Sequence, residues 1–247
     1  MICFEDVSKV YTIPGRPQVT ALADFSLEIP QGSSLCLIGT SGSGKTTALK
    51  MINRLVEPSR GRVTLGGEDL QRMDPIRLRR RLGYVVQSSG LFPHLTVAQN
   101  VSLLARLEGW SRSRLDPRIE ELLDRVKLPL AEYGHRFPDE LSGGQRQRVG
   151  IARALMLDPE GILLDEPFSA LDPITRSELR LEFLDLRKRL SKTLVMVTHD
   201  LHDAFVLADQ VVLMREGRAV QIGTPQQLKE SPASDFAREF VESQCLS

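Results

Sequence analysis

The stretch that decides the fold is an apolar segment, Ser34–Ile38, followed at once by a glycine-rich loop. The loop reads Gly39-Thr40-Ser41-Gly42-Ser43-Gly44-Lys45-Thr46, which fits the pattern G-x-x-x-x-G-K-[ST]. Glycines at these positions let the backbone turn its N–H groups inward, toward phosphate oxygens. Lys45 would then reach the β- and γ-phosphates of a nucleotide, and Thr46 would place its hydroxyl on Mg²⁺.

The residues on either side of this loop support a nucleotide site. An alternative interpretation is a glycine-rich turn that merely precedes a helix. The pattern requires an apolar strand before the loop and a helix after it, and both are indicated here. The helix that follows would also aim its positive N-terminus at the same anion.

Further short apolar runs predict more buried strands. They occupy Gly83–Val86, Ile162–Leu164, Leu194–Val197 and Val211–Met214. Uninterrupted apolar runs are typical of strands that are covered on both faces. Two sets of apolar residues follow helical spacing: Ala48, Met51, Ile52 and Leu55, and then Leu179, Phe183, Leu186 and Leu190. Strands that alternate with helices predict an α/β fold with a mostly parallel sheet.

Two regions depart from this alternation. In Arg62–Leu70, the run Val63-Thr64-Leu65-Gly66-Gly67 predicts a strand entering a hairpin turn, so antiparallel strands are expected beside the parallel core. The stretch from 91 to 148 is mainly helical in pattern. We therefore expect a single domain over residues 1–247, with a core and antiparallel β region in 1–87 and 149–247, and a helical lobe in 88–148.

The bulk composition excludes some classes of protein. The chain has 247 residues with 41% hydrophobic side chains, which suits one large domain. Its 32 basic and 32 acidic residues balance, whereas a sequence-independent nucleic-acid binder is usually basic, so no nucleic-acid partner is expected. The three cysteines, Cys3, Cys36 and Cys245, are widely spaced, which indicates a reducing compartment rather than a disulfide framework.

Hydropathy predicts a chain that reaches a membrane only through a partner. The first residues lack a basic stretch followed by an apolar one, so no signal peptide is expected. The longest apolar runs have the length of a strand, whereas a spanning helix needs about 20 apolar residues. We expect a chain that is soluble by itself.

A pair of acids follows one of the predicted strands. Asp165 and Glu166 come directly after Ile162-Leu163-Leu164. A strand that emerges into solvent would explain them, but ligands bind at the carboxyl ends of parallel strands. Successive strand residues point in opposite directions, so the two acids can serve different purposes. Asp165 would hold the Mg²⁺ shell, and Glu166 would act as the general base on the attacking water.

A third motif precedes the helical stretch Arg146–Met156 and reads Leu141-Ser142-Gly143-Gly144-Gln145. Taken alone it predicts a helix start with Ser142 as N-cap. Its place between the loop and the acid pair resembles the ATP-binding-cassette family, and further motifs follow in the family's order. They are Gln87 in Tyr84-Val85-Val86-Gln87, the D-loop Ser169-Ala170-Leu171-Asp172, the switch histidine in Thr198-His199-Asp200, and Tyr11 after Val7-Ser8-Lys9-Val10.

This resemblance covers nearly the whole chain and implies a P-loop NTPase fold with a RecA-like core, ATP and Mg²⁺ as cofactors, and named site residues. The residues implied to hold ATP are Tyr11, Gly39, Thr40, Ser41, Gly42, Ser43, Gly44, Lys45, Thr46, Thr47, Gln87, Ser142, Gly143, Gly144, Gln145, Asp172 and His199. Those implied to hold Mg²⁺ are Thr46, Gln87 and Asp165. Those implied to act in catalysis are Glu166, His199, Gln87 and Lys45.

The resemblance also implies that two copies of the chain share each site. Ser142 and Gly144 would grip the γ-phosphate bound by the opposite protomer, and Asp172 would link the two sites. His199 would hold the γ-phosphate and the geometry around Glu166. Two of these assignments have alternatives. Tyr11 could be a strand aromatic at the edge of the core, and His199 could form a metal-binding pair with His202, although a third ligand is lacking nearby.

Three strings are similar to those of the ATPases of osmoprotectant importers, which carry glycine betaine, choline or carnitine, although amino-acid importers have related strings. They are Met51–Pro58, Gly90–Val97 and Ala170–Arg176. This implies a homodimer beneath two membrane permease subunits, a substrate-binding protein, and a cytoplasmic, peripheral place on the inner face of the membrane. Many members of that group continue into a regulatory tail, and we do not expect ionic-strength sensing through such a tail here.

Other functions remain as alternatives. Soluble cassette proteins of DNA repair or translation usually carry long coiled-coil insertions or two fused cassettes, which 247 residues do not accommodate. A P-loop kinase would not be expected to carry the Leu141–Gln145 motif together with Glu166. A nucleotide-binding regulator without hydrolysis is disfavoured because Lys45, Asp165, Glu166 and His199 are all present.

Overall fold

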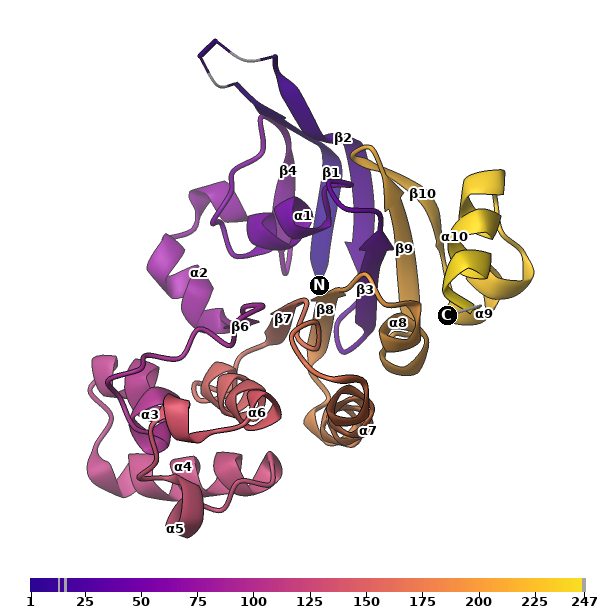
Figure 1. Ribbon diagram of the computed structural model, residues 1–247. Helices are drawn as coiled ribbons and strands as arrows, with labels where there is room; N and C mark the ends of the chain where they lie inside the picture. The colour runs from indigo at the N-terminus through magenta and orange to yellow at the C-terminus, as the bar shows by residue number, and fades with distance from the viewer. Residues whose placement is uncertain (13, 16, 246–247) are drawn as a thin grey trace. The chain divides into compact units, whose positions relative to one another are not determined.

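The chain divides into two compact units in the computed structural model, which describes residues 1–12, 14–15 and 17–245, without the side chain of Cys245 (Figure 1). The first unit consists of Met1–Arg79 and Thr193–Ser247, and the second of Arg80–Lys192. The phosphate loop therefore belongs to the first unit. The acid pair belongs to the second, and so does the stretch 88–148 that we expect to form the helical lobe.

An antiparallel sheet forms one part of the first unit. Its strands run in the order β2 (Val19–Ile29), β1 (Ile2–Tyr11), β4 (Arg60–Leu65) and β5 (Glu68–Asp69). Strands β4 and β5 pair antiparallel, and both residues of the turn between them have positive φ: 62° at Gly66 and 85° at Gly67. Glycine adopts this conformation without strain. The predicted hairpin is confirmed.

The phosphate loop follows a strand at the centre of the parallel part of this unit. Strand β3 (Ser34–Gly39) is buried along its whole length and pairs in parallel with β8 (Thr193–Val197) and β9 (Gln210–Arg215). These pairings confirm three of the predicted strands. A further strand, β10 (Arg218–Gly223), pairs antiparallel with β9. It escaped prediction because none of its residues is fully buried, so it has no continuous apolar run.

Helix α1 (Lys45–Ile52) begins at the phosphate loop and contacts strands of both sheets, β2 and β4 on one and β3 and β8 on the other. Ala48, Met51 and Ile52 are buried as their spacing predicts. The prediction for Leu55 was wrong. The helix ends at Ile52, Arg54 adopts a positive φ of 53°, and the Leu55 side chain is 49% exposed.

The remaining helices of the first unit follow its strands in sequence. After β5 come η1 (Leu70–Arg72) and α2 (Pro75–Arg81), whose last two residues enter the second unit. After β8 come α8 (Leu201–Leu207), α9 (Pro225–Glu230) and α10 (Asp235–Cys245). Helix α8 packs on β3, α9 on β9 and β10, and α10 on α9.

The second unit holds a parallel pair of strands, β6 (Leu82–Val85) and β7 (Gly161–Asp165), and several helices. The helices are α3 (Val97–Leu107), α4 (Arg112–Arg125), α5 (Leu130–Tyr133), η2 (Pro138–Glu140), α6 (Gly143–Ala154) and α7 (Pro173–Leu190). Leu179, Phe183 and Leu186 of α7 are buried, as their helical spacing predicts. Trp110 lies between α3 and α4, where the Arg114 guanidinium carbon stands 3.4 Å from the indole ring centroid.

Among the described residues, no helix combines the length and the apolar character needed to cross a membrane.

The buried thiol of Cys36 allows a first prediction. Cys36 lies in β3 with no exposed surface, and burial raises the pKa of its thiol well above the usual value. Because the thiolate is the reactive form, we expect Cys36 to resist iodoacetamide in the folded protein and to react once the chain is unfolded. Peptide mass mapping measures this, with the half-buried Cys3 as internal comparison. Native labelling of Cys36 as fast as Cys3 would contradict the burial.

Candidate active site

The phosphate loop (Gly39–Thr46) has a backbone that only glycine adopts easily. Gly39, Gly42 and Gly44 have φ values of 142°, 76° and 99°. A Cβ atom on Gly44 would collide with the carbonyl oxygen of Ala21, and one on Gly39 with that of Met214. Gly39 and Gly44 are therefore required both by conformation and by close packing of neighbouring backbone, and Gly42 by conformation alone. This tight path forms the cradle that the sequence predicts.

Lys45 lies inside this cradle. Its ammonium donates to the carbonyl oxygens of Gly39 at 2.9 Å and Thr40 at 2.8 Å, and to the Ser43 hydroxyl at 3.3 Å. The residue is only 6% exposed. A buried ammonium needs such partners because burial without them is costly. Its positive charge is thus held within the loop, next to α1's N-terminus, where Thr46 and Thr47 are half-buried.

In the second unit, Asp165 ends strand β7 and is 8% exposed. The Tyr84 hydroxyl, on the paired strand β6, donates to its Oδ2 atom at 3.1 Å. Burial, and then the charge of Asp165, raise the pKa of Tyr84 well above its usual value. Tyr84 therefore stays a hydrogen-bond donor across the working pH range. It was quoted in the sequence motif around Gln87, but its contact with Asp165 was not predicted.

Glu166 lies one residue further, with a positive φ of 47°. Such a conformation costs a non-glycine residue about 1–3 kcal/mol. The Gln87 amide donates to Glu166 Oε2 at 3.0 Å and to the Ser169 hydroxyl oxygen at 3.3 Å. The Ser169 hydroxyl in turn donates to the Glu166 carbonyl at 3.0 Å. Gln87 and Glu166 thus meet as a pair, with Ser169 as a third member that sequence reasoning did not assign.

The signature segment (Leu141–Gln145) starts helix α6. Ser142 is its N-cap: its hydroxyl accepts from the Gln145 N–H at 3.2 Å, and the Gln145 side chain accepts from the Ser142 N–H at 2.9 Å. This reciprocal arrangement is a capping box, which confirms the helix start predicted for Ser142.

The signature segment also meets the D-loop within the second unit. A Cβ on Gly144 would stand 2.8 Å from the Thr175 methyl, and one on Gly143 3.2 Å from Leu171 Cδ2. Asp172 caps helix α7 by accepting from the Thr175 N–H at 3.1 Å, and hydrogen bonds to Thr175 lower the pKa of this carboxyl. The two glycines therefore let the start of α6 approach the start of α7 closely.

Tyr11 and His199 both lie in the first unit. Tyr11 ends strand β1 with 37% of its surface exposed, and the Lys9 ammonium stands 5.0 Å from its ring centroid. His199 is exposed and lies in the switch segment (Thr198–Asp200) between β8 and α8. The predicted residues thus divide between the units: the loop, Tyr11 and His199 in the first, and Gln87, the acids, the signature segment and Asp172 in the second.

Comparison with known proteins identifies the family. The ABC transporter family model matches residues 22–169, from strand β2 to the D-loop. The chain belongs to the ABC transporter family. Its fold agrees: it resembles one chain of the dimeric structure of the ATP-binding cassette MJ0796 bound to ADP and Pi, with a TM-score of 0.80 and 32% identity, over 91% of this chain and 99% of that one.

Two relatives within the ABC transporter family resemble the whole chain. The glycine betaine/carnitine/choline transport ATP-binding protein OpuCA of Bacillus subtilis is 48% identical over 246 residues, which cover 100% of this chain and 63% of the relative. The glycine betaine uptake system ATP-binding protein YehX of Escherichia coli is 48% identical over 240 residues, which cover 97% of this chain and 76% of the relative. The chain thus spans less than two thirds of the length of OpuCA.

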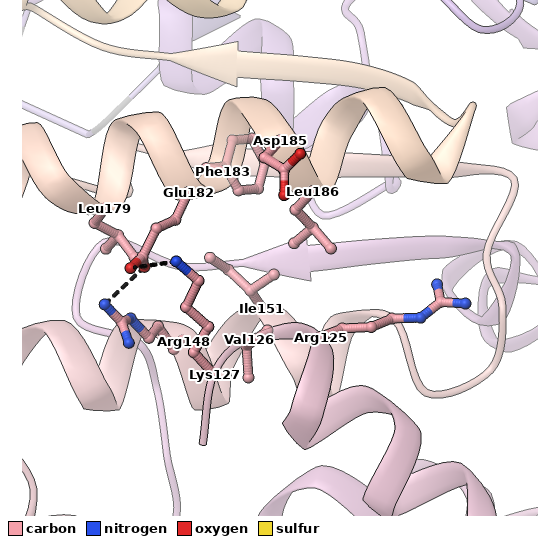
Figure 2. A pocket seen from close by; sticks show the side chains of 10 residues that line it. All are labelled: Arg125, Val126, Lys127, Arg148, Ile151, Leu179, Glu182, Phe183, Asp185 and Leu186. Atoms are coloured by element: carbon pink, nitrogen blue, oxygen red, sulfur yellow. Dashed lines mark hydrogen bonds and ion pairs between the residues drawn. The ribbon is translucent and has the colours of Figure 1, made fainter. Parts of the chain in front are cut away.

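A small pocket of about 30 Å³ lies in the second unit of this ABC transporter chain, and none of the predicted site residues lines it (Figure 2). Apolar side chains, including Ile151 of α6 and Phe183 of α7, line part of it. Glu182 lies at its edge and pairs with Arg148 at 2.6 Å and with Lys127 at 3.2 Å. Glu182 thus balances two of the positive charges around the pocket, which lies where residues of α6 and α7 come together.

No group of three or more His, Cys, Asp or Glu side chains in the described part of the chain is arranged to hold a metal ion. Mg²⁺ in nucleotide sites needs no such group, because it is usually held by one or two carboxylates together with substrate phosphates and water. Hydroxyl, carboxylate and amide oxygens are the hard ligands that Mg²⁺ prefers. Thr46 in the first unit, and Gln87 and Asp165 in the second, each carry an oxygen of one of these kinds, so the residue types fit the ion chemically.

Proposed function

We propose that this chain is the ATP-hydrolysing subunit of a membrane importer for quaternary-amine osmoprotectants such as glycine betaine, choline or carnitine. The observation that supports hydrolysis is the contact between Gln87, which follows β6, and Glu166, which follows β7. Their side chains share a hydrogen bond, and Glu166 has a positive φ. The observation that carries the cargo class is the 48% identity to OpuCA and YehX, whose names include glycine betaine.

The phosphate loop binds the triphosphate in this proposal. The glycines bring backbone N–H groups to the phosphates, and Lys45 supplies a positive charge that is already held in place by Gly39 and Thr40. Tyr11, partly exposed at the end of β1, offers a flat surface on which an adenine ring stacks. Mg²⁺, when bound by Thr46, Asp165 and Gln87, neutralises charge on the phosphates.

Glu166 acts as the general base. Gln87 donates to Glu166 Oε2 and so orients the carboxylate, which takes the proton of the attacking water. The water oxygen forms a bond to the γ-phosphorus as the bond to the β-phosphate oxygen breaks, which leaves ADP and phosphate. His199 donates to the γ-phosphate and stabilises the charge that spreads over its oxygens.

We infer that two copies of the chain close on ATP. In support, the structural neighbour MJ0796 was solved as a dimer with ADP and Pi. Ser142 and Gly144 of each copy would contact the γ-phosphate bound by the other, because the N-terminus of α6 presents backbone N–H groups and a positive dipole end to an anion. Asp172 would link the two sites. Closure excludes water and strengthens each electrostatic contact.

A pair of membrane permease subunits is the proposed partner, with a substrate-binding protein in the complete system. This would place the chain on the cytoplasmic face of the membrane. In support, Phe92, Leu104 and Leu107 of the second unit expose 43%, 38% and 70% of their surface, and the two leucines lie three residues apart on α3. Exposed apolar residues that share a helix face suit a protein contact.

The proposed activity is tested by Mg²⁺-dependent ATP hydrolysis measured against protein concentration. If catalysis requires two copies, the rate rises faster than linearly with concentration until the dimer is saturated. A strictly proportional rate from a chain that is monomeric by size-exclusion chromatography would contradict the shared site. No hydrolysis under any of these conditions would contradict the enzyme itself.

The cargo class requires a separate experiment. Deleting the gene for this chain should abolish high-salt uptake of labelled glycine betaine, choline or carnitine, and re-expression should restore it. A labelled amino acid serves as the control cargo. Loss of amino-acid uptake with normal osmoprotectant uptake would overturn the assignment while leaving the ATPase intact.

A further inference from the structure

The C-terminal helix of the chain holds the switch segment through one side chain. Gln244, in the last turn of α10, donates through Nε2 to the carbonyl oxygen of His199 at 2.9 Å. The same amide accepts, through Oε1, from the backbone N–H of Leu201 at 2.8 Å. The donor and the acceptor of the Gln244 amide thus bind the backbone of His199 and of Leu201, the two residues that flank Asp200. The backbone on either side of Asp200 is held at two points by a residue 45 positions away from His199.

Other contacts of the switch segment lie within the segment and with helix α8. The Thr198 hydroxyl donates to the buried carboxylate of Asp203 at 2.8 Å and accepts from the Asp200 N–H at 3.1 Å. Asp200 caps α8 by accepting from the His202 N–H at 2.8 Å. These contacts fix the residues before and after His199, but none of them reaches its carbonyl oxygen. Gln244 supplies that contact.

Helix α10 is anchored firmly enough to act as a support. Ala237, Phe240 and Val241 are buried with 0%, 9% and 6% exposure. The Arg215 guanidinium lies 4.7 Å from the ring centroid of Phe236. A side chain on a packed helix defines a position more closely than one on a loop. The amide of Gln244 therefore holds the backbone of the switch segment in a defined position.

We propose that Gln244 is a positioning residue for ATP hydrolysis, which acts by fixing the backbone that carries His199. This rests on the proposed function, because it assumes that His199 contacts the γ-phosphate. Loss of the amide would let His199 adopt several positions, of which only one suits the developing charge. Small displacements of a group that stabilises charge reduce turnover more than they reduce binding of the nucleotide.

The chain offers a matched control. Gln221, in β10, makes the same two-point contact with another loop: its Nε2 donates to the Ser231 carbonyl at 3.1 Å, and its Oε1 accepts from the Ala233 N–H at 2.9 Å. Like Gln244, it is half-buried. Replacing either glutamine with alanine removes one donated and one accepted hydrogen bond to a loop backbone, but only one of the two loops carries a predicted site residue.

The test compares Gln244→Ala with Gln221→Ala in the full chain. Because Gln244→Ala removes two hydrogen bonds from the backbone around His199, we expect it to lower kcat roughly tenfold. The KM for ATP and the affinity for ADP should change less than about twofold. Gln221→Ala should keep kcat within about twofold of the wild type, with a similar thermal midpoint. Equal kcat values for the two variants would overturn the proposal. An inactive wild type would instead overturn the proposed function on which it rests.

Two further measurements separate positioning from general loosening. Gln244→Ala should speed hydrogen exchange at the Leu201 amide, which loses its acceptor, and leave the Ala233 amide unchanged. Gln244→Glu keeps the acceptor for the Leu201 N–H but loses the donor to the His199 carbonyl oxygen. We therefore expect slow hydrogen exchange at the Leu201 amide together with a low kcat. A Glu variant with full kcat would show that the contact with His199 does not matter, and would overturn the proposal.

Discussion

Replacing Glu166 with glutamine is expected to reduce ATP turnover roughly hundredfold or more while ATP binding persists. The two side chains have the same shape, and glutamine keeps an oxygen that can accept from the Gln87 amide, which now lies 3.0 Å from Glu166 Oε2. The cluster with Ser169 should therefore stay intact. Only the ability to take a proton from water is lost, so the ATP-bound dimer should accumulate. Steady-state ATPase rates and size-exclusion chromatography with ATP measure both effects.

A suitable control is Glu178→Gln on helix α7. Glu178 is an exposed acid of the same unit, so the substitution makes the same change of charge away from the cluster. We expect it to keep wild-type turnover. A Glu166→Gln chain that remains monomeric with ATP and turns over normally would sink the assignment of the general base.

The second large effect is expected from Lys45→Ala. The ammonium is held by the carbonyl oxygens of Gly39 and Thr40, so its charge is already directed into the phosphate loop. Hydrogen bonds to charged groups contribute about 1.5–3 kcal/mol, which corresponds to roughly a ten- to hundredfold loss of ATP affinity. The two carbonyl oxygens also lose their charged partner, so the loop itself should loosen. Titration with a fluorescent ATP analogue measures the affinity.

Lys50→Ala provides the comparison for this variant, because Lys50 lies in the last turn of the same helix, α1. Its removal takes away one positive charge without touching the loop, and affinity should stay within about twofold of the wild type. Circular dichroism would show that both variants are folded. Unchanged affinity in Lys45→Ala would refute the role of the cradle.

Much of the core was predictable because strands that are buried on both faces have uninterrupted apolar sequences. Strands β3, β7 and β8 are fully buried, and each is a continuous apolar run. Strand β10 is half-buried and so has no such run. The end of α1 was misplaced because Leu55 continues the helical spacing, although the backbone turns away at Arg54. Periodicity reports what a residue type prefers and not where tertiary packing ends a helix.

The site was predictable as a set of motifs, but not as a set of contacts. The patterns around Lys45, Gln87 and Glu166 are local in sequence, so they could be found there. The strained φ of Glu166 and the hydrogen bond from Gln87 depend on how β6 and β7 pair, which no local pattern encodes. Gln244 is a clearer case: a glutamine near the end of an amphipathic helix has no motif, and only the fold brings it to His199.

Trp110 is the chain's only tryptophan, and it lies between α3 and α4 with the Arg114 guanidinium against its ring. Intrinsic emission excited at the red edge of the indole band therefore comes from a single point in the second unit. A cation so close to an indole makes that emission sensitive to small shifts of either helix. The protein thus carries its own label-free optical probe, through which stopped-flow mixing could time any rearrangement of this helical region as ATP is bound and hydrolysed.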